Sequence, residues 1–186
     1  MANPPLDTVP ITQPGSLARD SNDNPVQGFG LTASETVTLT ANNTTAAVPI
    51  FHITGSVQVL GIYGVVTTDL GANHTAAYWR LNDQTAQVSI TLSTGTTLSA
   101  IKAGSVIVKK GLAAAALTKL DNVAGVVSEP TTLETSYYSP FVAVKKTGAT
   151  TDIEYVYSTT DAPTTGAIQF FVNWVRLSAD GNVTPV

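Results

Sequence analysis

The sequence contains no cysteine, few charged residues and no long apolar run. Without cysteine the chain forms no disulfide, no thiolate nucleophile and no cysteine-ligated zinc site, so its stability is expected to come from packing or assembly. Charged residues make up only 12% of the chain and leave a formal net charge of −4. No apolar run approaches the ~18 residues of a membrane-spanning helix, and we expect no membrane partner.

Basic residues form no cluster larger than the pairs Lys109-Lys110 and Lys145-Lys146. Nucleic-acid phosphates call for clustered Lys and Arg, so we expect no nucleic-acid partner. The first ten residues, MANPPLDTVP, have neither the positive segment nor the apolar segment of a secretion signal. These observations predict a protein that is made in a cytoplasm and stays soluble there until it binds a partner.

Threonine supplies much of the polarity that charged residues would otherwise supply. The chain has 29 threonines, 14 glycines and 10 prolines in 186 residues. Threonine is β-branched and favours strands, while glycine and proline favour turns. This composition predicts an all-β fold, and the length fits one domain or one domain with an arm.

The stretch 166–181, GAIQFFVNWVRLSADG, carries the clearest strand pattern in the chain. Its alternate positions Ile168, Phe170, Val172 and Trp174 are large and apolar, and only a β-strand places every second side chain on one face. We therefore expect a long strand with that face in the core. Ala179-Asp180-Gly181 is turn-like, and a short tail is expected to follow. Segments distant in the sequence must pair with this strand.

Strand patterns recur at short intervals through the rest of the chain. Runs rich in Val, Ile, Thr and Tyr, separated by polar turns, are typical of strands. Strands are expected at residues 35–40, 46–53, 55–67, 75–82, 85–92, 97–102, 105–110, 123–128, 141–146 and 153–158. About ten strands at this spacing predict a β-sandwich.

Some local features refine this prediction. Asp83-Gln84 and Ala103-Gly104 lie between paired strand segments and predict two hairpins. Pro49 predicts an edge or a bulge, and Gly61 and Gly64 predict a bulge or a close backbone approach. The segment 112–120, LAAAALTKL, is rich in alanine and predicts one short helix.

Residues 1–30 differ from the expected sandwich domain, residues 31–186. Half of the prolines lie in this segment, which excludes a helix or a central strand and predicts an extended conformation. One interpretation is a disordered tail. The other is an arm that lies along a neighbouring subunit, because its apolar residues would otherwise be exposed to solvent. The partner-binding residues of such an arm would be Pro4, Pro5, Leu6, Val9, Pro10 and Ile11.

The sequence gives little support for a catalytic, metal or cofactor site. His52 and His74 have no carboxylate at a ligand-like spacing and are expected to be structural. The segment 20–24, DSNDN, begins like a calcium loop, but Pro25 and Leu31 replace the required Gly and Glu. A turn is expected there, with a weak ion site as the alternative. No nucleophile–base signature or phosphate loop is present, so we predict no enzyme activity and no cofactor.

The tyrosines and tryptophans allow two interpretations. The pairs Tyr78-Trp79 and Tyr137-Tyr138, with Tyr155 and Tyr157, would suit a sugar-stacking platform. Tyr155 and Tyr157 share a strand face with Ile153, however, so packing in a core or an interface is the favoured interpretation.

Two long segments resemble a known class of protein. The beginning, DTVPITQPGSLARDSNDNPVQGFG, resembles the extended N-terminal region of small virion proteins of tailed bacteriophages, and the end, GAIQFFVNWVRLSADGNVTPV, resembles their closing strand. With its low-charge middle, the chain resembles the capsid decoration, or cement, proteins. The resemblance implies a β-sandwich, often of jelly-roll type, that forms a homotrimer. It also implies binding to the major capsid protein on the exterior of an icosahedral head, and no catalytic residues.

Alternative functions stay open from the sequence. The chain also suits a tail or head-fibre component of a virion. From a different class, a carbohydrate-binding β-sandwich module would use exposed Tyr or Trp rings.

Overall fold

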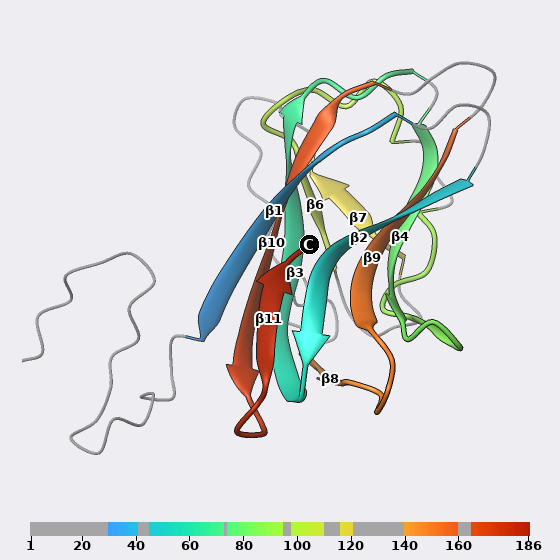
Figure 1. Cartoon of the computed structure of the whole chain (residues 1–186). Helices are drawn as coiled ribbons and strands as arrows, with labels where there is room; N and C mark the ends of the chain where they lie inside the picture. The colour runs from blue at the N-terminus through green and yellow to red at the C-terminus, as the bar shows by residue number, and fades with distance from the viewer. Residues whose placement is uncertain are drawn as a thin grey trace, which may run out of the picture.

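In the computed structural model the chain forms two antiparallel β-sheets packed face to face, a β-sandwich (Figure 1). The structure describes residues 30–40, 45–72, 74–94, 98–109, 116–120, 140–159 and 165–186. Its strands are β1 (Leu31–Thr38), β2 (Thr45–Thr54), β3 (Ser56–Thr68), β4 (His74–Asn82), β5 (Gln87–Ser89), β6 (Val106–Val108), β7 (Thr118–Leu120), β8 (Phe141–Val144), β9 (Thr151–Thr159), β10 (Ala167–Arg176) and β11 (Asn182–Pro185).

The first sheet has six strands in the order β1-β10-β3-β6-β7, with β8 pairing to the other end of β3. The expected period of two in β10 is confirmed, because Ile168, Phe170, Val172 and Trp174 are all buried. The strand pairs with β1 and β3, which lie far away in the sequence. β10 and β3 therefore form the centre of this sheet.

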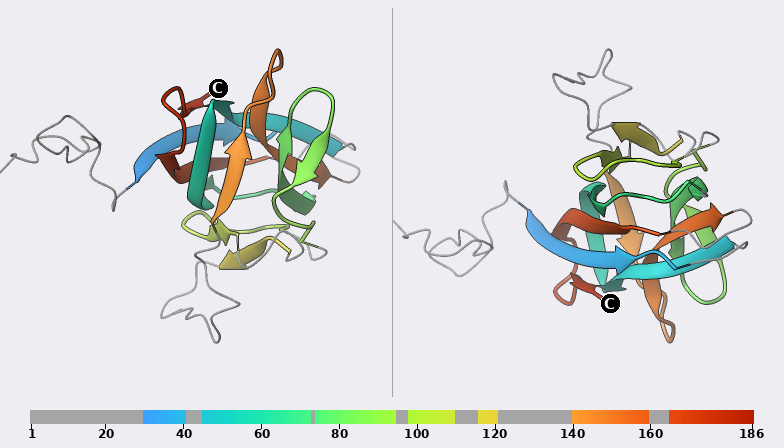
Figure 2. Two further views of the ribbon diagram at one scale, coloured as in Figure 1. Left: turned by 90° about the horizontal axis from the view of Figure 1, so that it is seen from below. Right: turned by 90° about the horizontal axis from the view of Figure 1, so that it is seen from above.

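The second sheet has five strands in the order β11-β2-β9-β4-β5. Its central strand, β9, turns Ile153, Tyr155 and Tyr157 into the core, as expected for that strand face. The chain crosses between the sheets at each step from β1 to β4 and again from β8 to β11. Figure 2 shows β1 and β2 meeting at one margin of the sandwich, where the two strands are in contact.

Aromatic rings join the two sheets in the middle of the core. The ring of Phe170 on β10 lies with its centroid 4.8 Å from that of Tyr155 on β9 and 6.4 Å from that of Trp79 on β4. Tilted and edge-on ring pairs of this kind contribute about 0.5–1.5 kcal/mol each beyond the area that they bury. Burial of the apolar strand faces supplies the rest of the driving force.

Two local irregularities match the sequence expectations. The register between β2 and β9 shifts between Pro49 and Phe51, which is the bulge that proline favours. At Gly64 an added Cβ would lie 2.8 Å from Ile168 and 2.9 Å from Ile107. Glycine is required there because β3, β6 and β10 approach one another closely at this point.

Three expectations about local structure are wrong. The predicted helix is a strand where it is described: β7 pairs with β6, and Ala116 forms a bridge with Leu92. Sheet pairing overrides the helix propensity of a segment too short to be stable alone. Residues 110–115, and the predicted strand 123–128, lie outside the described residues.

The predicted hairpin over 97–110 is also absent from its described part. Leu98 and Ile101 lie in an irregular loop, and their side chains are buried. Hydrogen bonds from the Leu70 amide to the Ile101 carbonyl and from the Ala100 amide to the Gly71 carbonyl hold this loop in place. The expected C-terminal tail is instead β11, which crosses to the second sheet and pairs with β2.

We predict that Trp174→Ala lowers the free energy of unfolding by about 3–5 kcal/mol, because it leaves a cavity in the core. The matched control is Leu177→Ala, three residues later, where the side chain is 53% exposed. That change should cost less than about 0.5 kcal/mol. Urea melts of both variants measure the difference. Equal midpoints for the two variants would contradict the role of Trp174 in the core.

Candidate functional site

The outward positions of β1, β3, β6, β8 and β10 in the six-stranded sheet carry no charged side chain. Strand register assigns each residue to the core or to the outer face. The outward positions of β1, β3, β6, β8 and β10 include Thr32, Ser34, Thr36, Gln58, Tyr63, Val65, Val106, Val142, Val144, Gln169, Phe171, Asn173 and Val175. We call this surface the uncharged face.

Aromatic and aliphatic side chains gather at the centre and one end of the uncharged face. Tyr63 and Phe171 are half-buried and stack in parallel, with ring centroids 4.9 Å apart and planes 13° apart. Val142 and Val144 on β8 are 56% and 60% exposed. Exposed apolar groups gathered on one face are typical of a protein–protein interface.

The uncharged face is large enough to hold a protein partner. β10 has 10 residues. With a rise of about 3.3 Å per residue and about 4.8 Å between strands, the 8, 10 and 13 residues of β1, β10 and β3 cover about 500 Å². A stable interface uses about 800 Å² from each partner, so this face supplies most of one side.

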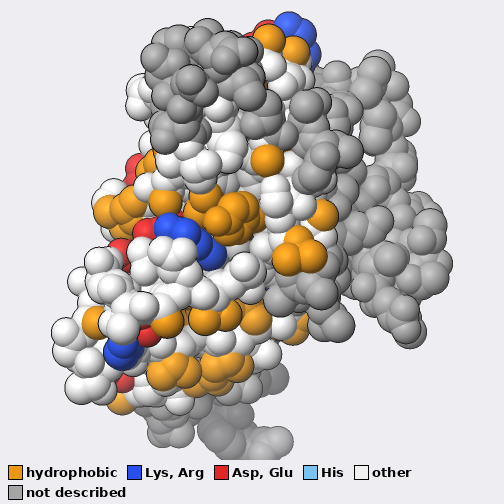
Figure 3. Space-filling view, turned by 90° about the vertical axis from the view of Figure 1, so that its right-hand side faces the viewer, with side chains coloured by type: hydrophobic (Ala, Val, Ile, Leu, Met, Phe, Trp, Pro, Cys, Tyr) orange, Lys and Arg blue, Asp and Glu red, His pale blue; other side chains and the backbone are white. Residues whose placement is uncertain are grey.

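The outer surface of the five-stranded sheet carries charged groups. Arg80 on β4 lies beside Glu154 on β9, with Nε 2.6 Å from Oε2, and Asn82 donates to Glu154 Oε1 at 2.8 Å. His52 on β2 bonds Asp152 at 2.9 Å. We call this surface the charged face; Figure 3 views this side of the molecule, where basic and acidic side chains lie close together.

Both carboxylates of β9 on the charged face are held by neighbouring side chains. Glu154 and Asp152 are largely buried, although they point outward, because the side chains of β2 and β4 cover them. Arg80 also donates to Gln87 on β5. The geometry ties β2, β9, β4 and β5 together through polar contacts, and it suits a structural network better than acid–base chemistry.

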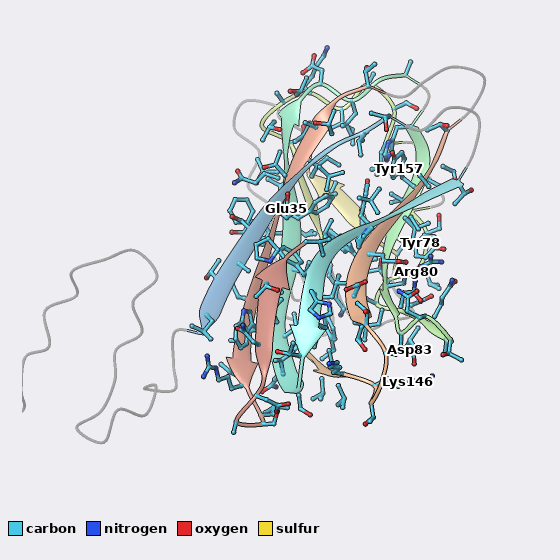
Figure 4. The ribbon with its side chains drawn as sticks, in the orientation of Figure 1. Glu35, Tyr78, Arg80, Asp83, Lys146 and Tyr157 are labelled. Carbon is cyan, nitrogen blue, oxygen red and sulfur yellow. The ribbon has the colours of Figure 1, made fainter. Side chains whose placement is uncertain are left out.

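Asp83 organises the turn that joins β4 to β5. Its Oδ1 accepts hydrogen bonds from the amides of Ala86 and Thr85, and these bonds, with Lys146 nearby, lower the pKa of Asp83. Its Oδ2 lies 3.6 Å from Lys146 Nζ. Figure 4 shows Arg80, Asp83 and Lys146 on the same side of the sandwich.

His74 is fully buried at the start of β4. Its ring stacks on Tyr157, with centroids 5.2 Å apart, and its Nε2 lies 3.1 Å from the hydroxyl of Tyr155. Nδ1 has no hydrogen-bond partner among the described residues. Burial lowers the pKa of His74 from 6.5 to about 4, so the ring is neutral at pH 7.

The sequence-predicted site residues have different outcomes. His52 and His74 are both hydrogen-bonded within the sandwich, which agrees with their expected structural role. Trp79, Tyr155 and Tyr157 are buried in the core and cannot stack on a sugar. Tyr137, Tyr138 and the segment 20–24 lie outside the described residues.

The expected partner-binding residues of the N-terminal arm also lie outside the described residues: Pro4, Pro5, Leu6, Val9, Pro10 and Ile11. Sequence reasoning missed both outer faces. The apolar outward positions of β3 and β10 were visible as a mixed second strand face, but their neighbours on β1, β6 and β8 were not known without the pairing.

Within the described ranges, no cluster of three or more His, Asp or Glu residues is placed to hold a metal ion. None of the described segments forms a helix long and apolar enough to cross a membrane. Comparisons with protein-family models, with curated proteins and with solved structures find no match.

We predict that Glu154→Ala lowers the free energy of unfolding by about 3 kcal/mol, because it leaves Arg80 largely buried without its carboxylate partner. The control is Lys102→Ala, which breaks an exposed ion pair with Asp69. An exposed pair contributes about 0–1 kcal/mol. Urea melts at pH 7 compare the two, and a loss for Glu154→Ala no larger than the control would contradict the network.

Acid is expected to destabilise the fold through His74. Its folded pKa of about 4 lies below its unfolded value of 6.5. Between these values the unfolded state binds more protons, so stability falls as the pH falls, by about 3 kcal/mol at pH 4 from this group. His74→Phe keeps the stacking and removes the proton site. Urea melts at pH 7 and pH 4 should therefore show a smaller acid loss in the variant; an equal loss would contradict this role.

Proposed function

We propose that this chain is a virion structural protein, a capsid decoration or cement protein that binds the exterior of an icosahedral phage head and stabilises it. The single observation that carries the proposal is the contrast between the two outer sheet surfaces. Exposed apolar and aromatic side chains gathered on an uncharged sheet face are typical of a surface that contacts another protein.

The uncharged face is the proposed contact surface toward the particle. Tyr63 and Phe171 at its centre are aromatic residues of the kind enriched at interfaces. The charged face, with its ion pairs already formed within the chain, is then the surface directed to solvent. A net charge of −4 suits an outer position, away from packaged DNA.

Stabilisation follows from mass action, because a protein that binds only the assembled shell shifts the equilibrium toward that shell. We further propose self-association into a homotrimer, which uses one heterologous contact repeated until the ring closes. The N-terminal segment 1–30, with Leu6, Val9 and Ile11, would add contact as an extended arm that orders on binding.

The finer description of the fold is part of this proposal. The repeated crossing of the chain between the two sheets supports a jelly-roll-like arrangement. The proposed role involves no enzyme activity, cofactor, nucleic acid or membrane. The protein would be made in the host cytoplasm and act on the virion exterior, with the major capsid protein as its partner.

The proposal is tested with heads from a phage that carries this gene and from a derivative that lacks it. Heads without the protein should release their DNA at a lower temperature, and the purified protein should restore the wild-type temperature. Phe171→Lys should fail to restore it, because a charge is placed in the contact. Thr184→Lys, on the exposed outer side of β11, should restore it. Equal DNA release with and without the protein would overturn the proposed function.

A further inference from the structure

β1 is the longest sheet edge among the described strands. It has 8 residues, and among the residues that the structure describes it pairs only with β10. The other described edge strands are shorter: β5 and β7 have 3 residues each, and β8 and β11 have 4 each. Proteins usually protect a long edge with Lys, Pro, a bulge or an inward-pointing charge, because its unpaired backbone groups can accept another strand. β1 contains neither Lys nor Pro, its register with β10 is unbroken, and its one charged side chain is Glu35.

The direction of the backbone groups of β1 follows from one hydrogen bond. The amide of Leu39 donates to the carbonyl of Gly166 at 2.9 Å, in register with the ladder between β1 and β10. In an antiparallel ladder these bonds recur at every second residue. The odd-numbered residues of β1 therefore face β10, and Thr32, Ser34 and Thr36 direct their N–H and C=O groups toward the free edge. Their side chains are exposed.

Glu35 is the charged residue of this edge strand. Its register partner is Phe170, which is buried, so Glu35 points to the core side of the sheet, at the margin of the sandwich where β1 contacts β2 and β11. The side chain is half-buried, and its Oε1 accepts a bond from the Thr36 amide at 3.0 Å. Figure 4 labels Glu35 on β1, on the side of the sandwich away from Arg80.

Glu35 disfavours pairing between the β1 strands of two copies. In such an antiparallel pair the two Glu35 carboxylates would lie opposite or diagonal to each other on one face, and like charges in these positions are destabilising. A different segment with a cation at this position would remove the repulsion and gain a charge-assisted contact. The charge on β1 therefore selects against a second copy and in favour of a basic partner.

We propose that β1 is a strand-addition site for an extended segment of a partner protein, with a Lys or Arg opposite Glu35. The main-chain bonds come from Thr32 and Ser34 and from the carbonyl of Thr36, whose amide already donates to Glu35, and the added strand extends the uncharged face by one strand. The identity of the partner as the shell subunit rests on the proposed function. Strand addition at β1 is a separate claim about how that subunit binds.

Hydrogen exchange at single-residue resolution tests the claim without any mutation. In the free protein the amides of Ala33, Glu35 and Val37 should exchange slowly, while those of Thr32 and Ser34 exchange fast. After binding to heads that lack the protein, Thr32 and Ser34 should be slowed as well. Binding to heads with unchanged exchange at these two amides would overturn strand addition and leave the decoration role intact. Failure to bind the heads at all would overturn both.

Variants at the edge give a second readout. Ser34→Pro removes an amide that faces away from β10, a change that edge strands tolerate. It should weaken head binding by about tenfold through loss of one backbone bond, whereas Ser34→Ala should bind like the wild type. Glu35→Gln should bind more weakly and lose salt dependence. Unchanged affinity in Ser34→Pro would contradict strand addition at β1. Unchanged affinity in Glu35→Gln would contradict a basic partner residue opposite Glu35.

Discussion

Phe170 on β10 contacts Tyr155 on β9 and lies edge-on to Trp79 on β4, and this meeting of rings links the two sheets through the middle of the sandwich. The contact depends on the period of two in each strand, which brings the three rings to the inner faces together. These rings and the apolar side chains around them fill the interior of the sandwich. The surfaces left for interaction with other molecules are then the two outer faces and the sheet edges.

The two outer faces divide the polar chemistry of the chain unequally. On the five-stranded sheet, Glu154 brings Arg80 and Asn82 together, so that its charge is balanced within the molecule. On the six-stranded sheet, the ring pair of Tyr63 and Phe171 lies among threonines, valines and amides without a charge beside it. The edge strand β1 continues this uncharged face, so one partner can cover the face and pair with the edge at the same time.

Local sequence patterns were sufficient to predict a strand wherever that strand buries one face along its whole length. β10, β3 and β9 were predicted from alternation alone, and Gly64 and Pro49 marked a close approach and a bulge. Prediction failed where a partner decided the conformation. The alanine-rich segment pairs with β6 beyond residue 117, and the residues after Gly181 pair with β2, because a free strand edge was available to each of them.

The sequence alone determined that the chain is built from strands with one buried face, since alternation of apolar and polar residues needs only local spacing. It also determined that little charge is available to any surface. Only the tertiary structure decided which strands are neighbours, and therefore that Arg80, Asp152 and Glu154 share one outer face while Ser34, Phe171 and Tyr63 share the other. The physical reason is that pairing between distant strands is set by the fit of whole sheet faces in the core, which no single segment encodes.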